Sequence, residues 1–171
     1  MTATVTDKAG KSNVAMLTVD YVEPISESIG TYTGTITLSG HIKSNEIAGY
    51  QTYDQDMDPE ELATTITIGS VGENGHVRAT LDIDGTPVSL YGTMAEDGTI
   101  TFDTFNFSKT INLFVDVTLN LTMELTGRIG EDDVLTLEGP ANGSGKTQVF
   151  IAYLEVNFEG NIEGRLEKVA E

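Results

Sequence analysis

The chain has 171 residues, which suit one domain or one domain with a fragment of another. Its 27 acidic and 9 basic residues give a formal net charge of −18, which argues against binding to nucleic acid or to anionic lipid. The absence of cysteine excludes disulfides and thiolate metal sites, and the absence of any run of 18 apolar residues predicts no membrane span.

Residues 1–27 stand apart from the rest of the chain. The stretch TATVTDKAGKSNVAMLTVDYVEP, at 2–24, resembles the last hairpin of a bacterial immunoglobulin-like domain. An isolated hairpin is marginal in water, so we expect it to dock on the main domain or to mediate self-association through residues 1–23. Pro24 and the Ser-Glu-Ser after it predict a short linker, and the main domain is expected at residues 28–171.

After a strand predicted at residues 31–40, the next element expected is a short helix at 59–63. Asp58 suits the position that caps a helix, and Pro59 suits its first turn. Glu60 and Glu61 favour the positive end of the helix dipole.

An alternative reading of the same acidic segment is a weak calcium site. Asp54, Asp56 and Asp58 alternate as the first carboxylates of a calcium loop do. An EF-hand is excluded, because its sixth and twelfth positions are occupied by Pro59 and Thr65 instead of Gly and Glu. Calcium is the only cofactor that the sequence suggests.

Residues 63–107 predict a meander of antiparallel strands. Asn74-Gly75 and Asp84-Gly85 separate alternating segments, and Asp97-Gly98 does the same further on. These dipeptides are strong hairpin signals, because Gly, Asn and Asp tolerate a positive φ.

Residues 111–125 predict one long strand, because every odd-numbered residue is apolar. At about 3.3 Å per residue such a strand is too long to stay flat, so we expect it to curl or to contain a bulge. Residues 150–166 alternate with the even-numbered positions apolar, and residues 134–139 predict a shorter strand.

Between these strands lies Gly139–Thr147, GPANGSGKT, which is similar to a phosphate-binding loop. That loop requires Gly where this chain has Pro140, and it leads from a strand into a helix, whereas an alternating segment follows here. We therefore expect no nucleotide and predict a flexible connection between the last two strands, at an open end of the fold.

About eight antiparallel strands with short connections favour an all-β, up-and-down β-barrel, with a two-sheet sandwich as the alternative. GTYTGTITLSG and the meander at 79–107, with the long strands after it, resemble the calycin-like (lipocalin-like) barrels of secreted Bacteroidetes proteins. The resemblance implies an exported protein of the cell surface, periplasm or exterior. Residues 1–20 contain no signal peptide, so any signal is expected outside this chain.

Two functions follow for a barrel of this size, whose interior is filled or holds one small ligand. The first is a non-enzymatic module that binds a small apolar ligand inside; the alternative is a structural or adhesive module with a filled core. No catalysis is expected, because His41 and His76 have no recognisable partners by spacing. The side chains expected to line the interior are Val115, Val117, Leu119, Leu121, Met123, Phe150, Leu154 and Val156.

Overall fold

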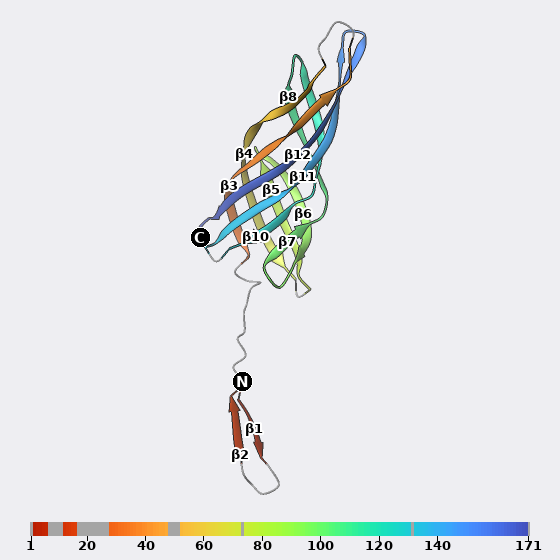
Figure 1. Cartoon of the computed structure of the whole chain (residues 1–171). Helices are drawn as coiled ribbons and strands as arrows, with labels where there is room; N and C mark the ends of the chain where they lie inside the picture. The colour runs from red at the N-terminus through yellow and green to blue at the C-terminus, as the bar shows by residue number, and fades with distance from the viewer. Residues whose placement is uncertain are drawn as a thin grey trace.

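The computed structural model describes residues 2–6, 12–16, 28–47, 52–72, 74–130 and 132–170. Within these ranges the regular structure is entirely β, which confirms the predicted class (Figure 1). Strands β1 (Thr2–Thr6) and β2 (Ser12–Met16) form an antiparallel two-stranded sheet of their own. The described residues include no helix long and apolar enough to cross a membrane.

The other ten strands form one antiparallel sheet. They are β3 (Gly30–Ser44), β4 (Asp54–Val71), β5 (His76–Ile83), β6 (Thr86–Met94), β7 (Thr99–Phe102), β8 (Phe105–Asn112), β9 (Asp116–Met123), β10 (Thr126–Ile129), β11 (Val134–Val149) and β12 (Ala152–Lys168).

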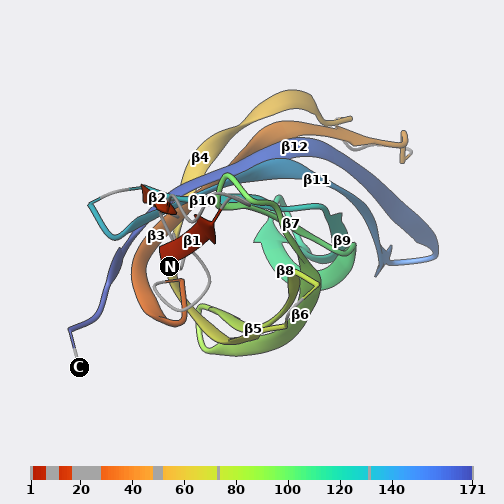
Figure 2. The same ribbon diagram turned by 90° about the horizontal axis from the view of Figure 1, so that it is seen from below.

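The sheet closes on itself because β10, the first strand in the spatial order, also pairs with β11, which lies near the other end of that order. That order is β10-β7-β6-β5-β4-β3-β12-β11-β9-β8, and β10 also pairs with β11 (Figure 2). Eight strands therefore form a hydrogen-bonded ring. Strand β9 pairs with β11 at Ala141–Gly145, beyond the β10 pairing at Leu135–Glu138, and β8 extends the sheet from β9.

The predicted turns of the meander are confirmed. Asp84-Gly85 joins β5 to β6 with φ values of 50° and 79°, the two positive angles of a tight hairpin turn. Gly75 and Gly98 have φ values of 74° and 80° in the two neighbouring connections.

The single strand predicted at residues 111–125 is wrong, because the chain reverses at residues 113–115. Asn112 pairs with Asp116 across the turn, in a hairpin of β8 and β9. The turn has an odd number of residues, so odd-numbered side chains face inward on both strands. A period of two therefore continues through the reversal and does not distinguish this hairpin from a straight strand.

The flexible connection predicted at residues 139–147 is also wrong, because this segment lies within β11. Its odd-numbered residues face inward, and all of them are Gly or Ala except Thr147. Its even-numbered residues face outward. A Cβ on Gly145 would lie 2.5 Å from the Thr118 carbonyl oxygen of β9, so the small residues permit close approach of the two strands. Pro140, which has no N–H, lies where the partner of β11 changes from β10 to β9.

The helix predicted at residues 59–63 is replaced by a bulged strand. Leu38 of β3 pairs with Glu60 and Gly40 pairs with Met57, so Asp58 and Pro59 together oppose a single residue. The bulge accommodates a proline that cannot complete a regular ladder. Pairing with β3 and the burial of Leu62 in the core prevail over the local helix signals.

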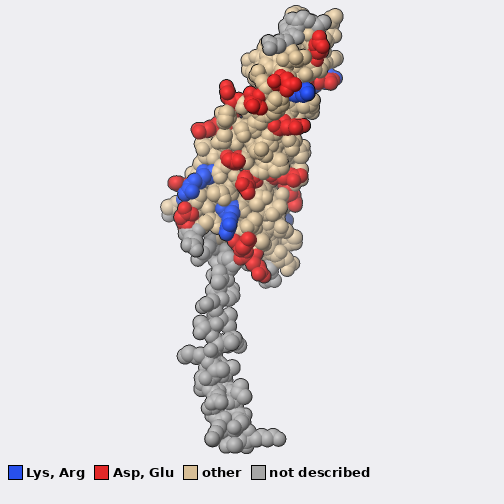
Figure 3. All heavy atoms as spheres, in the orientation of Figure 1, with Lys and Arg blue, Asp and Glu red and all other residues tan. Residues whose placement is uncertain are grey.

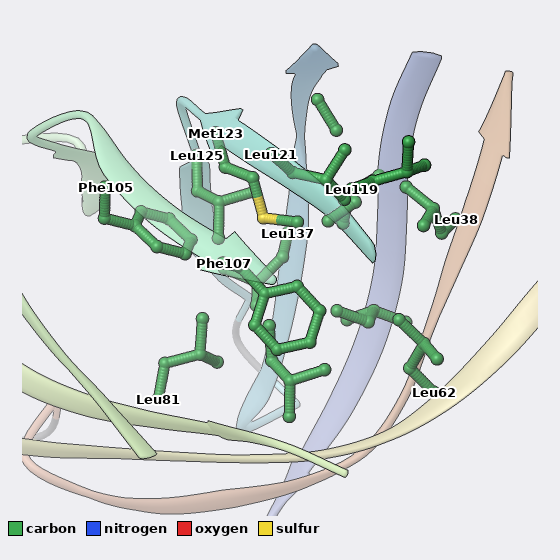
Figure 4. Packing of buried hydrophobic residues seen from close by; sticks show 14 of the residues in the cluster. Leu38, Leu62, Leu81, Phe105, Phe107, Leu119, Leu121, Met123, Leu125 and Leu137 are labelled. Atoms are coloured by element: carbon green, nitrogen blue, oxygen red, sulfur yellow. The ribbon is translucent and has the colours of Figure 1, made fainter. Parts of the chain in front are cut away.

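The inward side chains of the sheet pack as one hydrophobic cluster. Figure 4 shows Leu38, Leu62, Phe107 and Leu119 in this cluster, and each of them comes from a different strand. Tyr32 is fully buried, and its hydroxyl donates to the Ser28 carbonyl oxygen at 3.2 Å. Burial, aided by the charge of Asp133, raises the pKa of Tyr32 to about 12.

Candidate functional site

The outer face of β3 and β4 carries a cluster of His41, Asp54 and Asp56. His41 Nε2 lies 2.8 Å from Asp54 Oδ1, and Nδ1 lies 2.9 Å from Asp56 Oδ1. Alternation along β4 places both carboxylates on the outer face, and the register places His41 opposite Asp56. Lys43 Nζ lies 3.7 Å from the second oxygen of Asp54.

In this cluster the charged forms of His41 and Asp54 are both favoured. Hydrogen bonds with Asp56 and Asp54 raise the pKa of His41, and the bond with His41 lowers the pKa of Asp54. Asp58 lies in the bulge, outside these contacts. Among the described residues, no group of three or more His, Cys, Asp or Glu side chains has an arrangement that could hold a metal ion.

The interior holds most of the side chains predicted to line a ligand cavity. Val115 is half-buried beside the core. Six others are 0–1% exposed within it, namely Val117, Leu119, Leu121, Met123, Leu154 and Val156. A void large enough for water would leave accessible surface on the side chains that line it, and these six retain almost none.

Phe150 does not face the interior, so its predicted placement is wrong. It is 78% exposed and occupies the two-residue turn between β11 and β12, with φ of 55°. The in-and-out alternation of side chains along the strands ends at this turn. The even number of Phe150 therefore does not determine which way its side chain points.

Apolar side chains are exposed where β11 turns into β12 and β8 turns into β9, two turns that lie toward the same end of the molecule (Figure 1). Ile151 is fully exposed, Tyr153 is 52% exposed and Phe114 is 37% exposed. With Phe150, these residues are called the apolar end. Single exposed apolar residues are ordinary on protein surfaces, whereas grouped ones mark interaction sites.

Asn45, which follows β3, and Tyr53, which precedes β4, contact these two turns. Tyr53 stacks on Phe114 with ring centroids 6.0 Å apart. The Asn45 side chain donates to the Tyr153 carbonyl oxygen at 3.0 Å and accepts from the Glu155 N–H at 2.8 Å. The apolar end is therefore supported by contacts among three connections.

Lys146, the basic residue of GPANGSGKT, has protein partners on the outer face. Its Nζ lies 2.6 Å from Glu155 Oε1 and 4.6 Å from the centre of the Tyr153 ring. The hydrogen bond with Glu155 raises the pKa of Lys146. The side chain thus serves an ion pair between β11 and β12.

Sequence reasoning missed the apolar end, although two irregularities mark it. Phe114 is the only apolar residue on the polar parity of 111–125, and residues 149–153 are apolar on both parities. Both irregularities coincide with turns, where side chains leave the two faces of the sheet.

Comparison with known proteins finds likeness only among solved structures. No protein-family model matches the chain, and no curated protein matches it. Among solved structures, a multidomain protein including DUF1735 from Bacteroides ovatus is similar at 12% identity and a TM-score of 0.29. The likeness covers 78% of this chain and 56% of that one. Its TM-score is too low to bear on fold or function.

Proposed function

We propose that residues 28–171 form a closed, calycin-like β-barrel that works as a non-enzymatic adhesive module outside the cell. The ring of antiparallel strands and the single inward-facing core support a barrel. In this proposal residues 1–27 are the end of a preceding immunoglobulin-like domain. His41, whose two ring nitrogens are both engaged by carboxylates, gives no support to catalysis.

The apolar end is the observation that carries the proposal. A carrier of apolar ligands needs unfilled apolar surface inside, whereas four of the seven large apolar side chains that are exposed in the described residues gather at the apolar end. Aromatic side chains of this kind are enriched in protein interfaces. We infer that the function lies in protein–protein contact through this end, not in transport within the core.

The partner that the charges favour is a second copy of the chain, held end to end. Acidic side chains are spread along the visible side of the molecule, so two copies repel each other when they approach sideways (Figure 3). The four members of the apolar end are uncharged, and Lys146 beside Tyr153 is paired with Glu155. An end-to-end contact buries apolar surface and keeps the acidic bodies apart.

The double variant Phe150→Ser, Ile151→Ser tests this contact. Wild-type protein is expected to show concentration-dependent dimers by sedimentation velocity. The variant is expected to weaken the dimer at least about tenfold, because truncated aromatic anchors typically cost over 1 kcal/mol.

Val169→Ser is the matched control, because Val169 is 45% exposed and does not belong to the apolar end. It is expected to dimerise as the wild type does. A wild-type monomer at all concentrations would contradict the proposal, and so would dimers of undiminished strength in the double variant. The latter result would instead favour self-association through residues 1–23.

A further inference from the structure

A hollow of about 330 Å³ lies on the outer face of β4, β5 and β6, and none of its lining residues belongs to the apolar end. Its lining also includes Ala79 and Leu90, which belong to the core. Four hydroxyl side chains line it, from Thr67, Ser70, Thr80 and Ser89. Arg78 and Tyr91 complete its polar and aromatic lining, and its lining residues include no carboxylate.

The hollow exists because β4 has a bulge at this point. Ile68 pairs with Ala79 and Ser70 pairs with Arg78, so Gly69 has no partner in the ladder. The only non-neighbouring atom within 4 Å of a Cβ built on Gly69 is the Arg78 carbonyl oxygen, at 3.9 Å. The missing side chain therefore leaves open space beside Arg78.

Arg78 and Arg128 are the two basic residues in the described part of this acidic protein that form no ion pair with a described carboxylate. In the described part of the chain, five of the basic side chains form ion pairs with carboxylates, namely Lys43, Lys109, Lys146, Arg165 and Lys168. The Arg78 guanidinium instead lies over the ring of Tyr91, 5.7 Å from its centre, and forms no ion pair with a described residue. A guanidinium without a carboxylate partner can still bind an external anion through a bidentate pair of hydrogen bonds.

The lining selects a ligand class. A guanidinium recognises a carboxylate, and hydroxyl side chains exchange hydrogen bonds with a polyol. Tyr91 is 53% exposed, which leaves aromatic surface for the C–H face of a sugar ring. We propose that this hollow binds a saccharide bearing a carboxylate, such as a uronic acid residue, with Arg78 on the carboxylate and Tyr91 beneath the ring.

Binding is measured by calorimetry and saturation-transfer NMR on the whole chain, with digalacturonate as the probe and a neutral digalactoside for comparison. The acidic disaccharide is expected to bind at least about tenfold more tightly than the neutral one, because the charge-assisted bonds are lost with the carboxylate. Arg78→Ala is expected to abolish that preference. Gly69→Val, which fills the hollow without removing a charge, is expected to block both sugars.

Arg128→Ala is the matched control, because Arg128 is an exposed arginine on β10, outside this hollow. It removes the same charge and is expected to leave digalacturonate binding unchanged. Three results would each overturn the proposal: no digalacturonate binding, an equal loss in the Arg128 variant, or equal affinity for the neutral sugar. Inorganic phosphate competing as well as digalacturonate would identify a general anion site and would also overturn it. None of these outcomes depends on the apolar end.

Discussion

His41 is the residue whose protonation state most directly affects its neighbours. Because its pKa is raised above the ordinary value of 6.5, its ion pairs stabilise the folded protein fully below that pH and lose their effect as the pH rises through the raised pKa. The pKa of Asp54 is lowered from 3.8, so its contribution is full above that pH and is lost as the pH falls through the lowered pKa.

The variant His41→Asn is therefore expected to lower the melting temperature most between pH 3.8 and 6.5, and less at alkaline pH. The loss should be on the order of 1 °C, since these groups are exposed to water. Thermal unfolding followed by circular dichroism across this pH range measures the difference between variant and wild type.

The variant His76→Asn supplies the control, since it leaves His41 as the only imidazole. An NMR titration of that imidazole gives its pKa directly, and a midpoint above 6.5 is expected. A midpoint at or below 6.5 would contradict the ion pairs described for His41.

At the scale of the elements, the tight turns could be predicted from the sequence, whereas features that depend on pairing with a distant strand could not. The turn at Asp84-Gly85 follows from two residues that accept a positive φ. The reversal at residues 113–115 leaves the alternation of the flanking strands intact, and its one local sign is Phe114 on the polar parity. The bulge at Asp58-Pro59 depends on pairing with β3. The Arg78–Tyr91 hollow likewise depends on the Gly69 bulge, which no short sequence motif announces.

The pairing of β3 with β12 contains a glycine pair, Gly40 and Gly160, covered by Phe158. A Cβ on Gly160 would lie 2.2 Å from the Ser39 carbonyl oxygen and 2.5 Å from Phe158 Cζ. A Cβ on Gly40 would lie 2.5 Å from the Glu159 carbonyl oxygen and 2.6 Å from Phe158 Cζ. Gly160→Ala is therefore expected to lower the free energy of unfolding by about 1–3 kcal/mol, because both the β3 backbone at Ser39 and the buried Phe158 ring must move. Urea unfolding followed by circular dichroism provides the measurement.

Gly69→Ala is the matched control for this substitution, because a Cβ there meets no atom closer than 3.9 Å. It is expected to change the free energy of unfolding by less than about 0.5 kcal/mol. Adding Phe158→Leu to Gly160→Ala should cost less than the sum of the two single changes, because the smaller side chain at position 158 removes the clash of the new methyl group with the ring. Strict additivity, or an equal loss in the control, would contradict this account of the glycine pair.

At the scale of the whole molecule, the closure of the ring joins β10 to β11, strands on either side of a short connection, after seven other pairings have been made. The number of strands and their short connections favoured closure, but the sequence does not show which pair closes it. The buried residues change from even-numbered positions in β7 to odd-numbered positions in β8, which marks a break between Phe102 and Phe105. The sequence does not show that β7 belongs to the ring and that β8 lies outside it.

The charge of the whole molecule leads to the last prediction. The folded protein confines a net charge of −18 in a small volume, so self-repulsion is greater in the folded state than in the expanded unfolded chain. Raising NaCl from about 0.02 M to about 0.5 M shortens the screening length from roughly 20 Å to a few ångströms and is expected to raise the melting temperature by several degrees. Differential scanning calorimetry measures the shift.

A comparison of MgCl₂ with CaCl₂ at equal concentration separates screening from a specific calcium site. Screening depends on ionic charge, so the two salts are expected to raise the melting temperature equally. A site formed by Asp54, Asp56 and Asp58 would add a further increase with calcium that saturates with concentration and is removed by a calcium chelator. His41 already engages two of these carboxylates. In the variant His41→Asn, a calcium-specific rise in the melting temperature is therefore expected only if the freed aspartates converge on one ion. A saturable calcium effect in the wild type would show that calcium competes with His41 for them.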